Sequence, residues 1–124
     1  MNLVDSSGWL EYFSGTSLGN HYSKYVEQKE KLLIPTLVIH EVYRWIRVHR
    51  DEDEALKFVS SMNEGKVIAL DDTLALFAAD LRIEHKLAMA DSIVYATALQ
   101  HGAKLITSDA DFKNLPQVVY FPKN

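Results

Sequence analysis

Four acidic residues of the chain stand in surroundings that suit chemistry on a phosphate group: Asp5, Glu41, Asp91 and Asp109. Carboxylate oxygens are the ligands that Mg²⁺ and Mn²⁺ prefer in proteins. Several carboxylates around such a cation can hold a phosphate and bring a water molecule against it. If the four acids converge in the folded chain, they form a hydrolytic metal site. Asp5 and Asp91 would then be the principal ligands, while Glu41 and Asp109 would bind a second ion or orient the water.

Glu41 lies well inside a predicted helix, where capping cannot explain an acidic side chain. At about 100° per residue, the apolar side chains of this helix cover an arc of about 180°, and Glu41 falls within it. The residues that form the arc are Leu37, Val38, Val42, Trp45, Ile46 and Val48. A carboxylate that points inward is costly unless a cation or a hydrogen-bond donor meets it. A metal ion would meet that need, and so would a nearby Arg at the edge of the interface.

Asp91 is the single charged residue of the segment 87–99. The segment is apolar on nearly every face, which predicts a buried helix. Its four alanines, Ala88, Ala90, Ala96 and Ala98, permit other backbone segments to approach closely. A helix N-terminus also favours an ionised carboxylate. Asp91 is therefore either a buried metal ligand or the N-cap of its helix.

The remaining acids follow predicted strands. Asp5 comes directly before Ser6, Ser7 and Gly8, so a helix N-cap is its structural alternative. Asp109 and Asp111 follow the apolar residues 105–107, where the alternative is an Asx-type turn. We expect Ser6, Thr107 and Asp111 to support the site, the Thr107 hydroxyl by orienting a water or a carboxylate.

Asp71 and Asp72 also follow an apolar run, but they lead directly into a long amphipathic segment. Acidic residues at such a position cap the helix that follows and favour its dipole. We interpret this pair as structural.

Five short apolar runs alternate with six helical patterns along the chain. The expected strands are 2–4, 32–34, 66–70, 104–107 and 118–121, which we interpret as buried and parallel. The expected helices are 7–13, 19–29, 37–49, 52–62, 73–86 and 91–101. This alternation predicts an α/β fold in which helices flank a central, mainly parallel sheet. Ligands of such sheets bind beyond the carboxyl ends of the strands, where Asp5 and Asp109 are expected.

Composition limits the remaining possibilities. A chain of 124 residues with 48% hydrophobic residues and no repeat or linker suits a single domain spanning residues 1–124. The absence of cysteine excludes disulfides and thiolate metal sites, so a metal must be held by oxygen or imidazole. The sequence has neither a membrane-spanning run nor a signal-peptide pattern, and we expect a cytoplasmic protein without a membrane partner.

The net charge of −4 has the wrong sign for binding nucleic acid by bulk attraction. A local explanation removes the difficulty. If the four acids gather around cations, the other 13 of the 17 acidic residues balance the 13 Lys and Arg. The rest of the surface is then neutral.

Taken in order, these segments resemble the PIN-domain ribonucleases, and more narrowly the VapC-type toxins of type II toxin–antitoxin systems. The resemblance spans essentially the whole chain. It rests on Leu3 to Leu10, on Pro35-Thr36 leading to Glu41, on Ala90 to Leu99, and on Leu105 to Phe112.

The resemblance implies a PIN-like three-layer sandwich and an endoribonuclease that uses Mg²⁺, with Mn²⁺ able to substitute. It implies that Asp5, Glu41, Asp91 and Asp109 form the acidic site, supported by Ser6, Thr107 and Asp111. It also implies an RNA substrate, a cognate antitoxin, a homodimer, and a toxin that inhibits translation and growth.

Three other classes of protein can be weighed against the residues. A receiver-type phosphoacceptor domain has a similar size, but it requires paired acids near the first strand and a Lys after a late strand. A phosphatase of the aspartyl-phosphate type requires an Asp where Ser7 stands. A non-catalytic binding module, whose acids are caps and turns, would bind no divalent ion.

Two surface features could contact partners. Arg44, Arg47 and Arg50 run along one side of the Glu41 helix and could contact RNA backbone or a protein partner, although a solvated basic face is the more frequent explanation of such a pattern. An antitoxin segment could lie across exposed aromatic residues and place a basic side chain among the site acids. The candidate aromatic residues are Trp9, Tyr12, Phe13, Tyr43 and Trp45. The alternative is that these aromatic residues all belong to the core, as most aromatic residues at helical spacing do.

Overall fold

The strands pair in parallel throughout the sheet. The computed structural model describes residues 1–123. A three-stranded unit has the order β1-β4-β5, and a two-stranded unit joins β2 to β3. A parallel bridge between Asn2 and Leu32 places β2 on the free side of β1. The strands are β1 (Asn2–Val4), β2 (Leu33–Pro35), β3 (Lys66–Ile68), β4 (Lys104–Thr107) and β5 (Val118–Tyr120).

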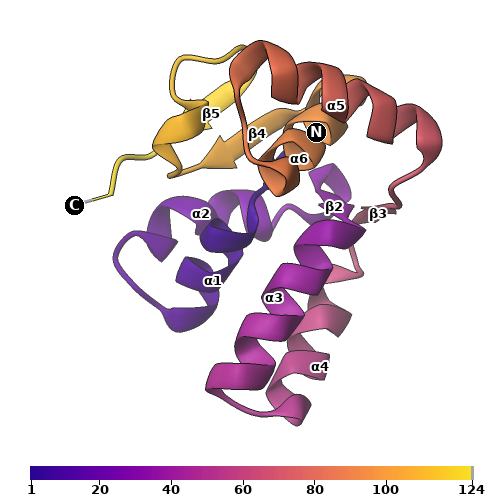
Figure 1. Ribbon diagram of the computed structural model, residues 1–124. Helices are drawn as coiled ribbons and strands as arrows, with labels where there is room; N and C mark the ends of the chain where they lie inside the picture. The colour runs from indigo at the N-terminus through magenta and orange to yellow at the C-terminus, as the bar shows by residue number, and fades with distance from the viewer. Residues whose placement is uncertain (124) are drawn as a thin grey trace.

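Helices cover both faces of this sheet, which confirms the predicted three-layer α/β architecture. In Figure 1, α5 runs across the top and α6 crosses in front of β4, whereas α1 and α2 lie below β4 and β5. The α3 and α4 helices form a pair that extends away from the sheet. The helices are α1 (Ser6–Ser14), α2 (Gly19–Val26), α3 (Thr36–His49), α4 (Glu52–Met62), α5 (Asp72–His85) and α6 (Met89–Gln100). Two 3₁₀ turns, Lys29–Lys31 and Ala110–Phe112, complete the elements of the described residues.

Helix boundaries follow local capping chemistry. Asp5 caps α1 by accepting a hydrogen bond from the Gly8 amide, and Asp71 caps α5 by accepting one from Leu74 at 2.8 Å. The structural interpretation of Asp71 is therefore confirmed. Helix α6 begins at Met89 and not at the predicted residue 91, so Asp91 lies in its first turn, and Ala88 is the N-cap. The alternative that Asp91 is an N-cap is wrong.

The core lies on both sides of the sheet. Leu3, Ile34 and Ile106 are fully buried on neighbouring strands, and Val42 on α3 and Ala96 on α6 pack against them. Burial of α6 agrees with its apolar sequence, because Val94 to Ala98 are all buried. Among residues 1–123, none of the helices has the length and apolar character that a membrane crossing requires.

Two predictions about burial are wrong. Strand β3 was expected to be buried over residues 66–70, but it ends at Ile68 and Val67 is 42% exposed. It pairs only with β2 and forms the edge of the sheet, where side chains meet solvent. Val48 was expected inside the apolar arc of α3, but it is 66% exposed because the end of α3 extends beyond the sheet.

Candidate active site

Parallel pairing brings the ends of β1 and β4 together. Val4 pairs with Ile106, so Asp5 and Thr107 follow at the same edge of the sheet. The Thr107 hydroxyl donates a hydrogen bond to Asp5 Oδ2, and it accepts one from the Asp109 amide at 3.0 Å. A single side chain from β4 therefore fixes the Asp5 carboxylate and the backbone that carries Asp109. The predicted role of the Thr107 hydroxyl in orienting a carboxylate matches this geometry.

The other carboxylate oxygen of Asp5 is held from within α1. Oδ1 accepts hydrogen bonds from the Ser7 hydroxyl at 2.9 Å and the Gly8 amide at 3.0 Å. Asp5 is only 8% exposed, and this burial raises the pKa of its carboxyl above the usual value. The hydrogen bonds from Thr107, Gly8 and Ser7 oppose the rise, and the charge of Asp109 adds to it. Asp5 is thus both a helix cap and a member of the acidic edge.

Asp91, Asp109 and Asp111 form the tightest acidic cluster. One carboxylate oxygen from each lies within 4.8 Å of the others, a spacing that suits a shared cation. Asp91 comes from α6, whereas Asp109 and Asp111 belong to the turn after β4. Asp109 Oδ1 accepts a hydrogen bond from the Asp111 amide at 2.9 Å, so the predicted Asx-type turn is present as well.

The negative charges of all the other site acids act on Asp91. Burial raises the pKa of its carboxyl to about 6, and the charges of Asp109, Asp5, Asp111 and Glu41 contribute in that order. Like charges so close together disfavour the ionised form of each carboxyl. A cation at this position would relieve the repulsion.

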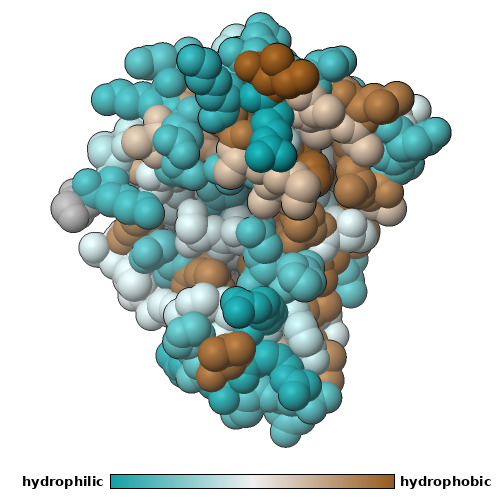
Figure 2. Space-filling view, viewed as in Figure 1, coloured by the Kyte–Doolittle hydropathy of each residue, from teal (hydrophilic) through white to brown (hydrophobic). Residues whose placement is uncertain are grey.

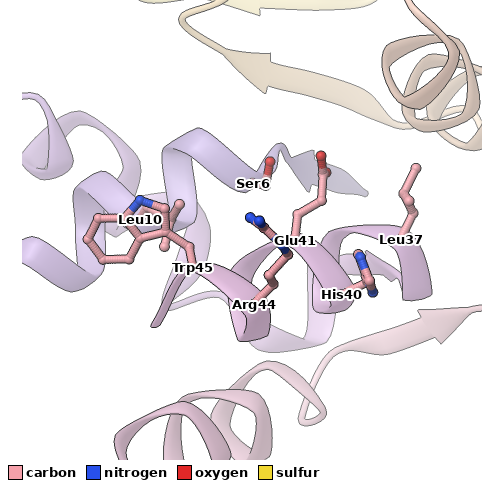
Figure 3. Close-up of a pocket in the computed structure, with 7 residues that line it drawn as sticks. All are labelled: Ser6, Leu10, Leu37, His40, Glu41, Arg44 and Trp45. Carbon is pink, nitrogen blue, oxygen red and sulfur yellow. The ribbon is translucent and has the colours of Figure 1, made fainter. Parts of the chain in front are cut away.

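Glu41 is half-buried on α3 and faces the same region. Burial raises the pKa of its carboxyl and the charge of Asp5 adds to the rise, while a Ser6 hydrogen bond and the charge of His40 oppose it. Within residues 1–123, no Lys or Arg nitrogen lies within 4.0 Å of its carboxylate. The alternative of an Arg partner for Glu41 is therefore not supported. Figure 3 shows Glu41 projecting from α3 toward Ser6 on α1.

One supporting contact was missed by sequence reasoning. The Tyr22 hydroxyl and the Ser108 hydroxyl are 2.6 Å apart, and both residues are buried. This bond ties α2 to the residue before Asp109. Nothing in the sequence signals it, because the partners are 86 positions apart and Tyr22 lies in an ordinary amphipathic helix. Ser7 could have been identified, since a hydroxyl two residues after an Asp commonly bonds to it.

The structure alters two predictions about surfaces that could contact a partner, the aromatic residues and the arginines. Trp9 is 2% exposed and packs edge-to-face on Phe58, so its proposal as an exposed antitoxin contact is wrong. Tyr12, Phe13, Tyr43 and Trp45 are half-buried against the core. Arg47 of α3 and Arg50, which caps the end of α3, pair with α4: Arg47 contacts Glu52 at 3.2 Å, and Arg50 lies 3.9 Å from Glu54.

The comparisons with known proteins agree with this geometry. The family profile of the PIN domain matches residues 3–118. The chain belongs to the PIN-domain family. This membership confirms the predicted resemblance and removes the receiver-domain alternative. No curated protein matches the sequence significantly.

Solved structures share this PIN fold over nearly their full length. A toxin–antitoxin complex from Klebsiella pneumoniae superposes with a TM-score of 0.84 at 25% identity, covering 99% of this chain and 100% of the other. VapBC2 from Rickettsia felis, bound to a DNA fragment from its promoter, superposes with a TM-score of 0.73 at 13% identity, covering 98% of this chain and 97% of the other. Mycobacterium tuberculosis VapC20, a sarcin–ricin loop cleaving toxin, superposes with a TM-score of 0.74 at 14% identity, covering 94% of this chain and 95% of the other.

Thr107 offers a direct test of how the PIN-domain site is held. We expect Thr107→Val to reduce affinity for Mn²⁺ by about 10- to 100-fold, because Asp5 and the Asp109 backbone both lose the hydroxyl. Thr107→Ser retains the hydroxyl and should stay within a few-fold of wild type. Calorimetric titration with Mn²⁺ measures the effect. Equal affinity in the Val and Ser variants would show that the hydroxyl has no such role.

The raised pKa values also predict how the stability of the metal-free protein depends on pH. Asp91 has a pKa of about 6 when folded and about 3.8 when unfolded, so the folded state binds protons more tightly between these values. Its contribution to stability therefore falls as pH rises from about 4 through about 6. We therefore expect the metal-free Asp91→Asn variant to become more stable than metal-free wild type as pH rises across this window. The difference in free energy of unfolding should be on the order of 1 kcal/mol at pH 7, because solvent screens the charge of this half-exposed carboxyl. Urea unfolding in EDTA measures the difference, and no change between pH 4 and 7 would contradict it.

Proposed function

We propose that this protein is a divalent-metal-dependent endoribonuclease and the toxin of a toxin–antitoxin pair. The observation that carries the nuclease proposal is the position of Asp91, which has carboxylate oxygens of Asp109 and Asp111 within 4.8 Å. Burial raises the pKa of the Asp91 carboxyl, and the charges of four other acids from three separate segments add to the rise. Five carboxylates concentrated at the carboxyl ends of parallel strands are unfavourable without cations. Membership of the PIN family and the similarity to a toxin–antitoxin complex at 25% identity support the same proposal.

The donor set fits Mg²⁺ or Mn²⁺. Asp91, Asp109 and Asp111 offer three hard oxygen ligands within 4.8 Å of one another, and the chain has no sulfur ligand from cysteine. Asp5 and Glu41 would complete the site. When bound, the cation supplies positive charge that stabilises a phosphate under attack. This assignment keeps all four predicted ligands and adds Asp111, which was expected only as support.

The reaction we propose is hydrolysis of an RNA phosphodiester. The oxygen of a water molecule attacks phosphorus, the bond from phosphorus to the 3′ oxygen breaks, and that oxygen takes a proton. The products then carry a 5′-phosphate and a 3′-hydroxyl. Glu41 suits the role of orienting the water, because its half-buried carboxyl faces the site beside Ser6. Thr107 and Ser7 keep the Asp5 carboxylate in one orientation.

The experiment for the enzymatic part is cleavage of single-stranded RNA by purified protein with Mg²⁺, Mn²⁺ or EDTA. We expect cleavage with either metal, none with EDTA, and fragments with 5′-phosphate ends. Calorimetry with Mn²⁺ in the absence of RNA separates this proposal from a non-catalytic binding module. A protein that binds no divalent ion and cuts no RNA would support the binding module.

The toxin part of the proposal has its own test. Expression of the protein alone should arrest growth and translation, and co-expression of the small open reading frame beside its gene should restore growth. An antitoxin could act by placing an Arg or Lys among the five acids, where it would replace the missing positive charge. If expression is harmless while purified protein cleaves RNA with magnesium, the toxin proposal is wrong and the protein is a housekeeping ribonuclease.

We further propose a cytoplasmic homodimer. The support is an apolar surface on and beside α5, seen as brown residues at the upper right of Figure 2, where Figure 1 places this helix. The exposed large apolar residues of α5 and of the segments before and after it are Leu70, Leu76, Ile83 and Met89. Exposed apolar patches of this kind often mark protein interfaces. Sedimentation equilibrium distinguishes a dimer from a monomer.

A further inference from the structure

A hollow of about 380 Å³ lies beside the acidic cluster, between α1 and α3. Ser6, Leu10, Glu41, Arg44 and Trp45 line it, together with Leu37 and His40. Glu41 and Ser6 belong to the acidic site and to this hollow, so the two are continuous. In Figure 3, Glu41 and Arg44 project from α3 toward α1, and Trp45 lies against Leu10 at one end.

Arg44 differs from the other arginines of its helix. Arg47 and Arg50 are engaged by acids of α4, at 3.2 Å and 3.9 Å. Arg44 is exposed, and within residues 1–123 no carboxylate lies within 4.0 Å of its guanidinium. Its positive charge is therefore available to a ligand, directly beside a cluster that would otherwise repel every anion.

The hollow combines this charge with an apolar wall. Trp45 stacks on His49 with ring centroids 4.1 Å apart, which fixes the indole where it meets Leu10. A nucleotide has the matching parts, namely a phosphate for the guanidinium and a flat base or ribose for the wall. A basic peptide segment would be attracted by Glu41 in the same hollow, but it offers no anionic group for the Arg44 guanidinium.

We propose that Arg44 forms a subsite for the RNA nucleotide next to the cleaved bond, with its guanidinium on the phosphate and the base or ribose against Trp45. This inference rests on the proposed RNA substrate. It adds an explanation of how a chain with a net charge of −4 can attract RNA. The subsite gives local attraction where bulk attraction is absent. Because it contacts phosphate, it strengthens binding without selecting a sequence.

The test measures RNA binding without cleavage. Asp91→Asn serves as the background, and fluorescence anisotropy follows a labelled, short, single-stranded oligoribonucleotide of mixed sequence. Adding Arg44→Ala should raise Kd about tenfold and reduce the slope of log Kd against log salt by about 0.7, as expected for one lost phosphate contact. Adding Arg47→Ala, the same charge change one turn away, should alter Kd less than about twofold. Arg44→Lys should recover part of the loss.

Equal effects of Arg44→Ala and Arg47→Ala would overturn the subsite, since they would reflect only general charge. Unchanged RNA affinity together with weaker antitoxin binding in Arg44→Ala would also overturn it and would assign the hollow to the protein partner. Failure of the proposed function is distinguishable, because it would appear as wild-type protein that neither cleaves RNA nor binds Mn²⁺. When Arg44→Ala is the single substitution and Asp91 is retained, it should raise KM for RNA cleavage while kcat and the Mn²⁺ affinity stay near the wild-type values.

Discussion

Asp91→Asn should reduce RNA cleavage by about 100- to 1,000-fold and remove most Mn²⁺ binding. Asp91 is one of three carboxylates whose oxygens lie within 4.8 Å of one another, and it also faces Asp5 and Glu41. Asparagine has the same shape but neither the charge nor the second anionic oxygen. Cleavage assays and calorimetric titration measure the two losses. We expect the same direction from Asp5→Asn, in which the amide oxygen can still cap α1.

The fold should survive this substitution. Removing one of several crowded like charges relieves repulsion, so metal-free Asp91→Asn should unfold at the same temperature as metal-free wild type or at a higher one. Asp80→Asn on the exposed side of α5 is the matched control and should change neither activity nor metal binding. Full cleavage by Asp91→Asn would sink the assignment of this residue, whereas loss of the cooperative melting transition would make it a structural residue.

Gly8→Ala should destabilise the protein by about 1 to 3 kcal/mol through overpacking. An added Cβ would lie 2.5 Å from Tyr22 Cε1 and 2.8 Å from Val4 Cγ1, and both neighbours are fully buried. The Tyr22 ring cannot move aside without straining its hydroxyl contact to Ser108. The site should suffer too, because the Gly8 amide donates to Asp5.

Urea unfolding measures the loss of stability, and Mn²⁺ titration at a temperature where the variant is folded measures the effect on the site. Ser14→Ala on the exposed end of α1 provides the control and should shift stability by less than about 0.5 kcal/mol. A Gly8→Ala variant as stable as this control would mean that Tyr22 has another position available.

Much of the fold could be predicted because hydrophobic periodicity is local. The alternation of short apolar runs and helical patterns gave the element order, and parallel pairing then placed Asp5 beside Asp109. The inward angle of Glu41 was also readable, since it depends only on spacing within one helix. These inferences need no knowledge of the partner segment.

The errors arise where the answer depends on distant segments. Trp9 was expected at the surface, but α4 covers it through Phe58, a contact that α1 alone does not encode. The closeness of Asp111 to Asp91 could not be predicted either, because it is set by how α6 docks beside the turn after β4; the expected supporting role of Asp111 stays a prediction. The pairing of Tyr22 with Ser108 has the same origin.

The hydrogen bond from Thr107 to Asp5 joins residues 102 positions apart, and it has a consequence for synthesis of the protein. Strand β1 is made first, yet its partners β2 and β4 are made later, β4 near the end of the chain. A nascent polypeptide still attached to its ribosome through residues 104–111 therefore has no assembled site. If the protein cleaves RNA as proposed, this order of assembly delays its activity until residues 104–111 have been made and have folded.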